Sequence, residues 1–210
     1  MIKLKELIEL KSMVYTEEVK PKHQKRMDRT TEVFWNTLSL PFIKPPENDH
    51  SITLGEVKYL KSIKPNKDFV KEGDDIREVF KPLIEKYDVN ISEKYIDKIL
   101  KESNKFIYQL KYIYNRPRPH QIAEFYDIKL NGVELDSMNT PSYPSGHATQ
   151  GYLVGEILSR FDPQNAVTYR QKAEDIAHSR IVAKAHYPSD KRYGKKISKV
   201  LFTGIRKWSV

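Results

Sequence analysis

The chain has 210 residues and a net charge of +9, and it contains no cysteine. This length predicts a single domain over residues 1–210 that can bury a sizeable core. The lack of cysteine excludes a disulfide framework, a thiolate nucleophile and cysteine ligands for a metal. No apolar run approaches the roughly 20 residues that cross a bilayer, and the N-terminus lacks the apolar centre of a secretion signal. We therefore expect no integral membrane span and a cytoplasmic location, or a periplasmic or secreted one only if a signal has been removed.

The N-terminal part of the chain predicts a helical extension over residues 1–53. Helical periodicity covers residues 1–13 and about 16–38, although Pro21 interrupts the second segment. The stretch LPFIKPPENDHSIT indicates a loop because of its Pro-Pro pair and its polar cluster. Short helices are expected next, near residues 54–63 and 69–87.

Residues 92–205 predict the core of the domain. A long amphipathic helix begins after the cap residue Ser92 and ends near Tyr114, because the sequence RPRP that follows removes backbone donors. A small β-hairpin is expected at residues 127–136, around the Asn-Gly pair of IKLNGVEL. Further helices are expected at residues 145–160, 164–184 and 189–205. The predicted fold is therefore all-α, a helical bundle with one small β-hairpin.

Four cationic residues do not fit a simple helical bundle. Arg180 falls on the apolar face of its predicted helix, where a guanidinium needs a carboxylate or a bound anion. Lys111 lies beside the buried stripe of its own helix, and prolines hold Arg116 and Arg118 in extended geometry just after it. These charges repel one another unless an anion lies opposite, and phosphate matches a guanidinium well. Taken singly, each side chain could instead extend to the surface along its aliphatic stem.

The stretch SYPSGHATQG places Ser145, Gly146 and His147 at the start of a predicted helix. A helix N-terminus has free N–H groups and the positive end of the helix dipole, and both attract anions. Glycine lets the backbone approach a ligand, serine adds a hydroxyl donor, and His147 stands where it could deliver a proton. The alternative is an ordinary serine cap followed by a histidine without a chemical role.

His186 and Asp190 form a further polar pair, separated by three residues that include Pro188. A carboxylate that accepts a hydrogen bond from one imidazole nitrogen fixes the tautomer and leaves the other nitrogen free to attack. Such a pair is often structural when it stands alone.

The order of these motifs resembles a known family. Over about residues 105–195 the chain carries, in order, Lys111-x₆-Arg118-Pro119, Pro144-Ser145-Gly146-His147 and Ser179-Arg180-x₅-His186-x₃-Asp190. This arrangement is similar to the three-part motif of the type 2 phosphatidic acid phosphatase superfamily. That superfamily includes soluble class A bacterial acid phosphatases, membrane lipid phosphatases and vanadium-dependent haloperoxidases. The resemblance implies the helical bundle of the acid phosphatase and vanadium haloperoxidase type.

The resemblance also implies a role for each residue. The residues that would hold the phosphoryl oxygens are Lys111, Arg118, Ser145, Gly146 and Arg180. His186 would be the nucleophile, Asp190 its orienting partner, and His147 the acid that protonates the leaving oxygen. Ser179 would pack or hydrogen-bond locally. Three fixed cations can stabilise charge on the equatorial oxygens of a phosphoryl group without a metal.

We therefore expect a soluble, metal-independent phosphatase that hydrolyses small phosphomonoesters, with nucleotides and diphosphates among the candidates, through a phosphohistidine. It would need no cofactor, and vanadate would bind as a phosphate mimic. The alternative enzymes are a lipid phosphate or pyrophosphate phosphatase at a membrane surface and a vanadate-dependent haloperoxidase. A phosphate- or nucleic-acid-binding module would use the positive charge but not the histidines. A metal-dependent hydrolase would need a second carboxylate beside His147, His178, His186 and Asp190.

Two features lie outside the common pattern. Lys184 stands where family members usually carry glycine, two residues before His186. We expect its side chain to be solvated or to lie at the mouth of the pocket, where it would favour a second anionic group. The basic residues between 191 and 208 accompany an apolar helical face, and they form either a solvated surface or a contact with an anionic surface.

Overall fold

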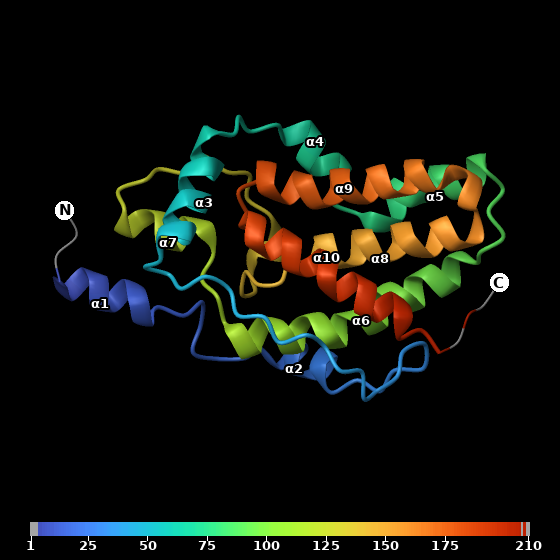
Figure 1. Ribbon diagram of the computed structural model, residues 1–210, viewed down its shortest axis with the longest axis horizontal. Coiled ribbons are helices and arrows are strands. Elements are labelled where there is room, and N and C mark those ends of the chain that lie inside the picture. The colour runs from blue at the N-terminus through green and yellow to red at the C-terminus, as the bar shows by residue number, and fades with distance from the viewer. Residues whose placement is uncertain (1–3, 207, 209–210) are drawn as a thin grey trace.

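The computed structural model describes residues 4–206 and 208, so residues 1–3 of the first predicted helix and the basic residue Lys207 lie outside the described part. The described chain is built from α-helices and two short 3₁₀ turns (Figure 1). In chain order these are α1 (Leu4–Ser12), α2 (Pro21–Met27), α3 (Ser51–Ser62), α4 (Lys67–Glu72), α5 (Ile76–Lys86), α6 (Glu93–Tyr114), α7 (Pro119–Phe125), η1 (Asp136–Met138), α8 (Gly146–Phe161), η2 (Pro163–Asn165), α9 (Ala166–Val182) and α10 (Pro188–Thr203). The all-α prediction is confirmed.

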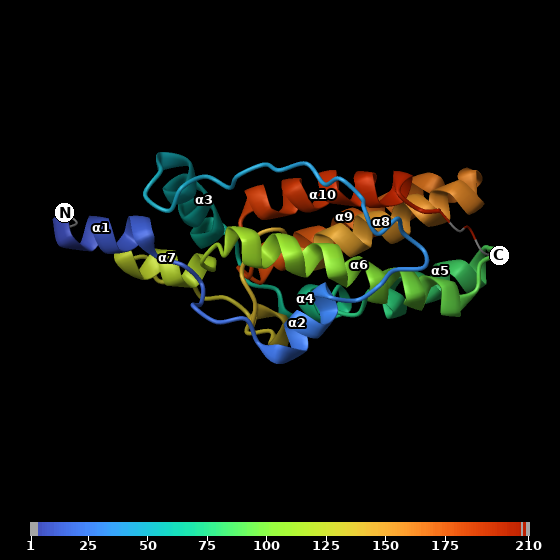
Figure 2. The same cartoon turned by 90° about the horizontal axis from the view of Figure 1, so that it is seen from below.

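Helices α8 and α9 pack along each other, and α6 and α10 pack against α8 (Figures 1 and 2). Glycine on α8 permits the close approach to α9. A Cβ atom at Gly155 would lie 3.0 Å from the Cβ of Ala173 and 3.1 Å from the carbonyl oxygen of Tyr169. Small residues at a helix crossing allow the two backbones to come together, so the α8–α9 pair forms the centre of the hydrophobic core.

The predicted β-hairpin at residues 127–136 is wrong, because no strand pair forms in that segment. The N–H of Val133 donates instead to the carbonyl of Ala183, just after α9, over 3.1 Å. Ile128 and Leu130 pack in one hydrophobic cluster, whereas Val133 and Leu135 pack in another. The two arms of the segment find partners in different parts of the core, which keeps them from pairing with each other. Within the described residues the one isolated β-bridge joins Phe34 to Ile205.

The prediction of a helix over residues 16–38 is correct only for α2. Beyond Met27 the chain is irregular, because side chains satisfy its backbone groups. The Glu102 carboxylate on α6 accepts from the N–H groups of Glu32 and Val33, at 2.9 and 2.8 Å. A distant carboxylate that takes these backbone donors leaves them unavailable to a helix. The predicted helix 69–87 is likewise divided, into α4 and α5, and α7 begins unpredicted with Pro119 in its first turn.

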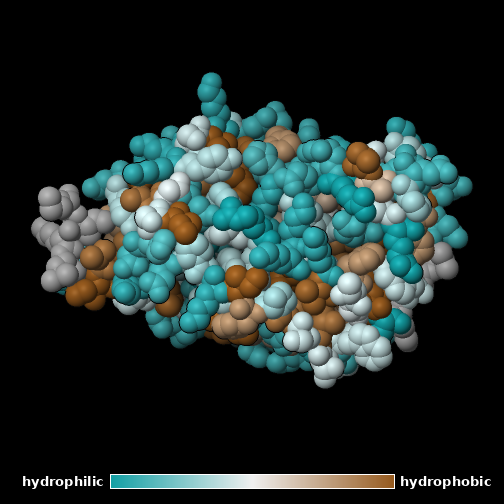
Figure 3. Space-filling model, in the orientation of Figure 1, coloured by the Kyte–Doolittle hydropathy of each residue, from teal (hydrophilic) through white to brown (hydrophobic). Residues whose placement is uncertain are grey.

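The helices bring several of their ends to one place. The C-terminal turns of α6 and α9 lie near the N-terminal turns of α7, α8 and α10 (Figure 1). The helix α1 extends at one end of the long axis, next to α7 (Figures 1 and 2). The face shown in Figure 3 is mostly hydrophilic, with hydrophobic side chains gathered in its lower half. Among the described helices, none combines the length and the apolar character that a bilayer crossing requires.

Candidate active site

His186 and Asp190 meet at the N-terminus of α10. The Nδ1 atom of His186 lies 3.1 Å from Oδ2 of Asp190, and both side chains are buried. Arg118 approaches the other ring nitrogen, with Nη1 3.0 Å from Nε2. A carboxylate only accepts hydrogen bonds and a guanidinium only donates them. These two partners therefore assign the proton to Nδ1 and the lone pair to Nε2.

Asp190 is held by four donors. Its Oδ1 accepts from Arg116 Nη1 at 2.7 Å, and its Oδ2 accepts from the Tyr187 N–H at 3.0 Å, from the Ser142 hydroxyl and from His186. Arg116 is itself buried and extends to Glu56 of α3, at 3.5 Å. The negative group expected opposite Arg116 is thus supplied by carboxylates. Its guanidinium is occupied by carboxylates on the far side of Asp190, where it fixes the orienting residue in place.

Two cations lie near the pair of His186 and Asp190. Lys111 comes from α6, and Arg118 comes from the start of α7. Arg118 is 1% exposed, and its donors are spread over the carbonyls of Thr140, Ala185 and Ser137 at 2.7–3.0 Å. Lys111 is buried and donates to the carbonyl of Pro141. Burial, with the charge of Arg118, holds the pKa of Lys111 well below its usual value. Both cations are locked by carbonyl oxygens and have no carboxylate within ion-pair distance in the described residues, so an anion beside them would be strongly favoured.

The start of α8 has the geometry of an open helix N-terminus. The Ser145 hydroxyl accepts from the Ala148 N–H at 3.3 Å and so caps the helix. The first backbone bond to Ser145 comes from Thr149, which leaves the N–H groups of Gly146 and His147 without a partner in the described residues. A Cβ atom at Gly146 would meet only a methyl group of Ile107, at 3.6 Å. Glycine is thus not required there by packing, which leaves open access to the backbone as its physical advantage.

Arg180 meets a carboxylate rather than open space. Its Nη1 lies 2.6 Å from Oδ1 of Asp74, in the turn between α4 and α5, and its Nη2 donates to the Val70 carbonyl over 2.6 Å. His147 contacts the same turn. Its Nε2 lies 3.0 Å from the Asp74 carbonyl oxygen and 3.6 Å from Oδ1 of Asp74. Of the two partners expected for Arg180, an anion or a carboxylate, the structure supplies the carboxylate.

A cavity of about 300 Å³ connects four of the predicted residues. It is lined by Lys111, Gly146, His147 and His186, among others. Ser145, Arg118 and Asp190 are buried directly behind this lining, through the contacts given above. Arg180 does not line the cavity. It is linked to the cavity through Asp74, which contacts both Arg180 and the lining residue His147.

Burial and positive charge keep both histidines neutral. Burial, then the charges of Arg118 and Lys111, lower the pKa of His186 well below its usual value. Burial, then Arg180, lowers the pKa of His147 to about 4. A neutral His186 is the form that has a lone pair on Nε2, which here accepts the hydrogen bond from Arg118, and a neutral His147 must take up a proton before it can act as an acid.

Lys184 departs from its predicted environment. The expectation of a solvated side chain is wrong, because Lys184 is 5% exposed, and the alternative place at the pocket mouth is not seen either, because Lys184 does not line the cavity of about 300 Å³. Its φ of 59° is left-handed, and the N–H of the next residue, Ala185, donates to the Arg180 carbonyl over 3.1 Å. This conformation ends α9 and lets Arg180 and His186 approach the same region. Glycine adopts it at lower energy, which gives the usual glycine its physical reason.

Several residues at the site come from the first hundred positions, where the sequence showed no motif. Asp74 contacts Arg180 and His147, Glu56 supports Arg116, and His23 and Arg26 of α2 line the cavity. One signal was available, because Lys22, His23 and Arg26 occupy neighbouring positions of a short helix opened by Pro21. Among the described residues, no group of three or more His, Asp or Glu side chains is arranged to hold a metal ion, and His178 instead lies against the ring of Phe69.

The chain belongs to the PAP2 superfamily, whose family model matches residues 100–209. It is 32% identical over 65 residues to a non-specific acid phosphatase of Salmonella typhimurium, covering 31% of this chain and 26% of that protein. It is 43% identical over 53 residues to an acid phosphatase of Zymomonas mobilis, covering 25% of this chain and 20% of that protein. The chain thus matches about a quarter of the length of these curated relatives.

A solved structure has a similar fold. It is described as the first transmembrane PAP2-type phosphatidylglycerolphosphate phosphatase, from Bacillus subtilis, and it aligns with a TM-score of 0.51 at 15% sequence identity. The alignment covers 73% of this chain and 82% of that one. At this identity the likeness concerns the fold alone, and it extends the resemblance beyond the residues of the family model.

Proposed function

We propose that this protein is a metal-independent phosphatase that hydrolyses small phosphomonoesters through a phosphohistidine on His186. One observation carries the proposal: Nδ1 of His186 is tied to Asp190 while Nε2 lies beside Arg118, next to a cavity lined by Lys111 and His147. Family membership and the partial identity to acid phosphatases support the same reaction.

The reaction has two displacement steps. The lone pair of His186 Nε2 attacks phosphorus, the bond from phosphorus to the leaving oxygen breaks, and a protonated His147 gives that oxygen its proton. Water then attacks the phosphohistidine, His147 takes a proton from the water, and the P–N bond breaks to release phosphate and restore Nε2. Asp190 stabilises the charge that develops on the His186 ring.

The charge on the phosphoryl oxygens is balanced by fixed donors. Lys111 and Gly146 line the cavity, and the Gly146 N–H needs no reorganisation to meet an anion. Arg118 lies directly behind the wall with all five of its N–H groups engaged, so the one that points to His186 Nε2 would pass to a phosphoryl oxygen when that nitrogen attacks. Arg180 would join them by exchanging Asp74 for a phosphoryl oxygen. Vanadate, which has the same tetrahedral charge distribution, would bind to the same donors.

The test compares wild type with His186→Ala on p-nitrophenyl phosphate, nucleotides, sugar phosphates and lipid phosphates in vesicles, all in the presence of a chelator. We expect wild type to be active in chelator and His186→Ala to lose about 1000-fold or more in kcat. His178→Ala is the matched control, because His178 does not line the active-site cavity. Acid-labile label trapped from a ³²P substrate would identify the phosphohistidine. Equal activity of His186→Ala and wild type would overturn the proposal, and loss of activity in chelator would overturn metal independence.

The alternatives make different predictions. Bromide oxidation with vanadate and peroxide, in place of ester hydrolysis, would indicate a haloperoxidase. A preference for vesicles would support an anionic-surface contact through residues 191–208. Two of the cations in that segment, Lys191 and Arg192, are already paired, with Glu174 and Glu56, so the surface available to an anionic partner is smaller than the sequence suggests.

A further inference from the structure

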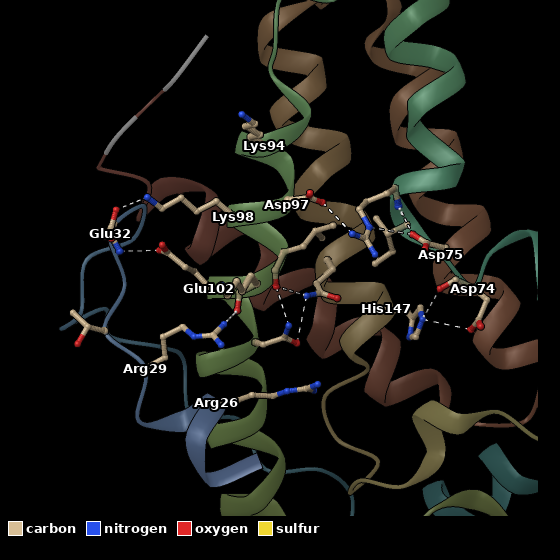
Figure 4. A pocket seen from close by; sticks show the side chains of 17 residues that line it. Arg26, Arg29, Glu32, Asp74, Asp75, Lys94, Asp97, Lys98, Glu102 and His147 are labelled. Carbon is tan, nitrogen blue, oxygen red and sulfur yellow. Dashed lines mark hydrogen bonds and ion pairs between the residues drawn. The ribbon is translucent and has the colours of Figure 1, made fainter. Parts of the chain in front are cut away.

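A second and larger cavity, of about 870 Å³, adjoins the candidate active site (Figure 4). Four residues line both cavities: Arg26, Asn104, His147 and Gln150. His147, the proposed acid for the leaving oxygen, therefore stands at the boundary between them. We call the cavity of about 300 Å³ at His186 the inner cavity and the one of about 870 Å³ the outer cavity. When a phosphoryl group is held at His186 in the inner cavity, the rest of the substrate would extend past His147 into the outer cavity. Volumes of this size are typical of small-molecule sites.

Arg26 of α2 is fixed at this boundary without an acidic partner. Its guanidinium lies over the ring of Tyr108, 4.9 Å from the centroid, and donates to the Tyr108 hydroxyl. No carboxylate of the described residues lies within ion-pair distance of it. Figure 4 shows its side chain extending from α2 across α6 toward the side on which His147 lies. Arg26 is thus oriented in advance, with donors still available for a ligand.

The acids of the outer cavity already have partners. Asp75 and Asp97 pair with Arg77, Glu32 pairs with Lys98, Glu102 accepts from backbone N–H groups, and Asp74 pairs with Arg180. The cations Arg29, Lys94 and Lys101 line the same cavity and have no ion pair in the described residues. Among the described residues that line the inner cavity, Asp136 is the one acid, against the cations Lys22, Arg26 and Lys111. The cavity surface near Arg26 therefore carries an excess of positive charge.

The surroundings of His23 show the same excess of positive charge. It is buried on α2, lines the inner cavity, and its Nδ1 lies 2.6 Å from the Tyr112 hydroxyl. Burial, then the charges of Arg26 and Lys22, lower its pKa to about 4. A neutral imidazole does not balance the positive charges of Arg26 and Lys22. These charges would therefore attract an anion that enters beside Arg26.

We infer that Arg26 forms a subsite for a second phosphate on the leaving-group side, so that the preferred substrate is a small diphosphate or bisphosphate. The inference rests on the proposed function, since it takes His186 as the position of the phosphoryl group that is transferred. The subsite belongs to α2, which lies outside the residues matched by the family model. The subsite would therefore set the substrate preference of this protein from α2, a helix that carries no part of the three-part motif.

Binding of two non-hydrolysable probes tests the subsite without turnover. Isothermal calorimetry would compare methylenediphosphonate with methylphosphonate on wild type and on Arg26→Gln, which keeps most of the side-chain stem on Tyr108 but removes the charge. We expect wild type to bind the diphosphonate about tenfold more tightly than the monophosphonate, and Arg26→Gln to lose most of that difference, as expected for a charge-assisted hydrogen bond. Lys25→Gln is the matched control, because Lys25 is the neighbouring cation on α2 and lines neither cavity.

Kinetics with ADP and AMP separate the subsite from the reaction itself. The ratio of kcat/KM for ADP to that for AMP should fall about tenfold in Arg26→Gln and stay unchanged in Lys25→Gln. Hydrolysis of AMP by wild type supports the proposed function whatever this ratio does. An unchanged ratio and equal binding of the two phosphonates in wild type and Arg26→Gln would overturn the subsite alone. If wild type hydrolyses neither the nucleotides nor the other substrates of the panel, the reaction is wrong, and the phosphonate titration still decides whether Arg26 binds a second phosphate.

Discussion

Arg180 and Asp74 form an ion pair of 2.6 Å between Nη1 and Oδ1, and it joins the end of α9 to the turn between α4 and α5. Arg180 is 1% exposed, whereas the Asp74 side chain is 52% exposed. A phosphoryl group at the site would compete with this carboxylate for the same guanidinium. Under the proposed function, the Asp74 carboxylate would therefore compete with the substrate for Arg180.

The variant Asp74→Asn should bind inorganic phosphate about threefold more tightly than wild type, because an amide competes less strongly for Arg180 than a carboxylate does. Without phosphate the variant should melt at a lower temperature, since a buried guanidinium has lost its counter-charge. Thermal melts over a phosphate titration measure both effects. Asp75→Asn is the control, because Asp75 pairs with exposed Arg77. Identical phosphate-induced shifts in wild type and Asp74→Asn would show that no competition takes place.

The buried pair of Arg116 with Asp190 should contribute far more to stability than the surface pair of Arg192 with Glu56. Arg116 has a side chain that is 2% exposed, and Arg192 one that is 64% exposed, although both contact Glu56. Arg116→Ala leaves the buried Asp190 without its counter-charge, so the free energy of unfolding should fall by about 3 kcal/mol. Arg192→Ala should cost about 1 kcal/mol or less. Urea unfolding of the two variants gives both values, and equal losses would contradict this assignment.

Lys184→Gly should be more stable than Lys184→Ala by about 1 kcal/mol. Both substitutions remove the lysine side chain beyond Cβ, so their difference isolates the energy of the left-handed backbone at φ 59°. Chemical denaturation of the two variants is the measurement. If alanine proved equal to glycine at this position, the end of α9 would have to adopt a different conformation in solution.

Stability should fall as the pH drops from about 6.5 toward 4. The folded protein holds the pKa of His147 and of His23 at about 4, below the value near 6.5 of an exposed imidazole. Between these two values the unfolded chain binds more protons than the folded one, so lowering the pH favours unfolding by on the order of 2 kcal/mol for each histidine. Thermal melts at pH 7.5, 5.5 and 4.5 would show the trend. His23→Gln and His147→Gln should each flatten it, and a melting temperature independent of pH would contradict the low pKa values.

Bound phosphate should oppose the loss of stability at low pH. A bound anion raises the pKa of His147, so binding takes up a proton and becomes tighter as the pH falls. The same linkage favours an acidic optimum for kcat/KM, because the free protein must protonate His147 before that residue can act as an acid. A phosphate-induced rise in melting temperature that is smaller at pH 5.5 than at pH 7.5 would contradict the linkage.

Patterns that depend on neighbouring residues were predicted well from the sequence. The helix expected from Ser92 to Tyr114 is α6, Glu93–Tyr114, because one apolar stripe and a serine cap define it locally. The helices expected to begin near residues 145 and 189 begin at Gly146 and Pro188, within one residue of the prediction. The hairpin and the helix over residues 16–38 failed because long-range partners, Ala183 and Glu102, take the backbone groups that local pairing would use.

By itself the sequence determined which residues have the chemistry for a phosphoryl group and that they belong to helix ends, because caps, prolines and residue spacing are local properties. Only the tertiary structure decided which partner each charged group meets. It assigned Arg116 to Asp190, turned Arg180 toward Asp74 and brought Arg26 to the cavity from a helix about eighty residues before Lys111 in the chain. Ion pairing and burial depend on distances in space, and the packing of α2 on α6, of α6 on α8 and of α4 on α9 sets those distances.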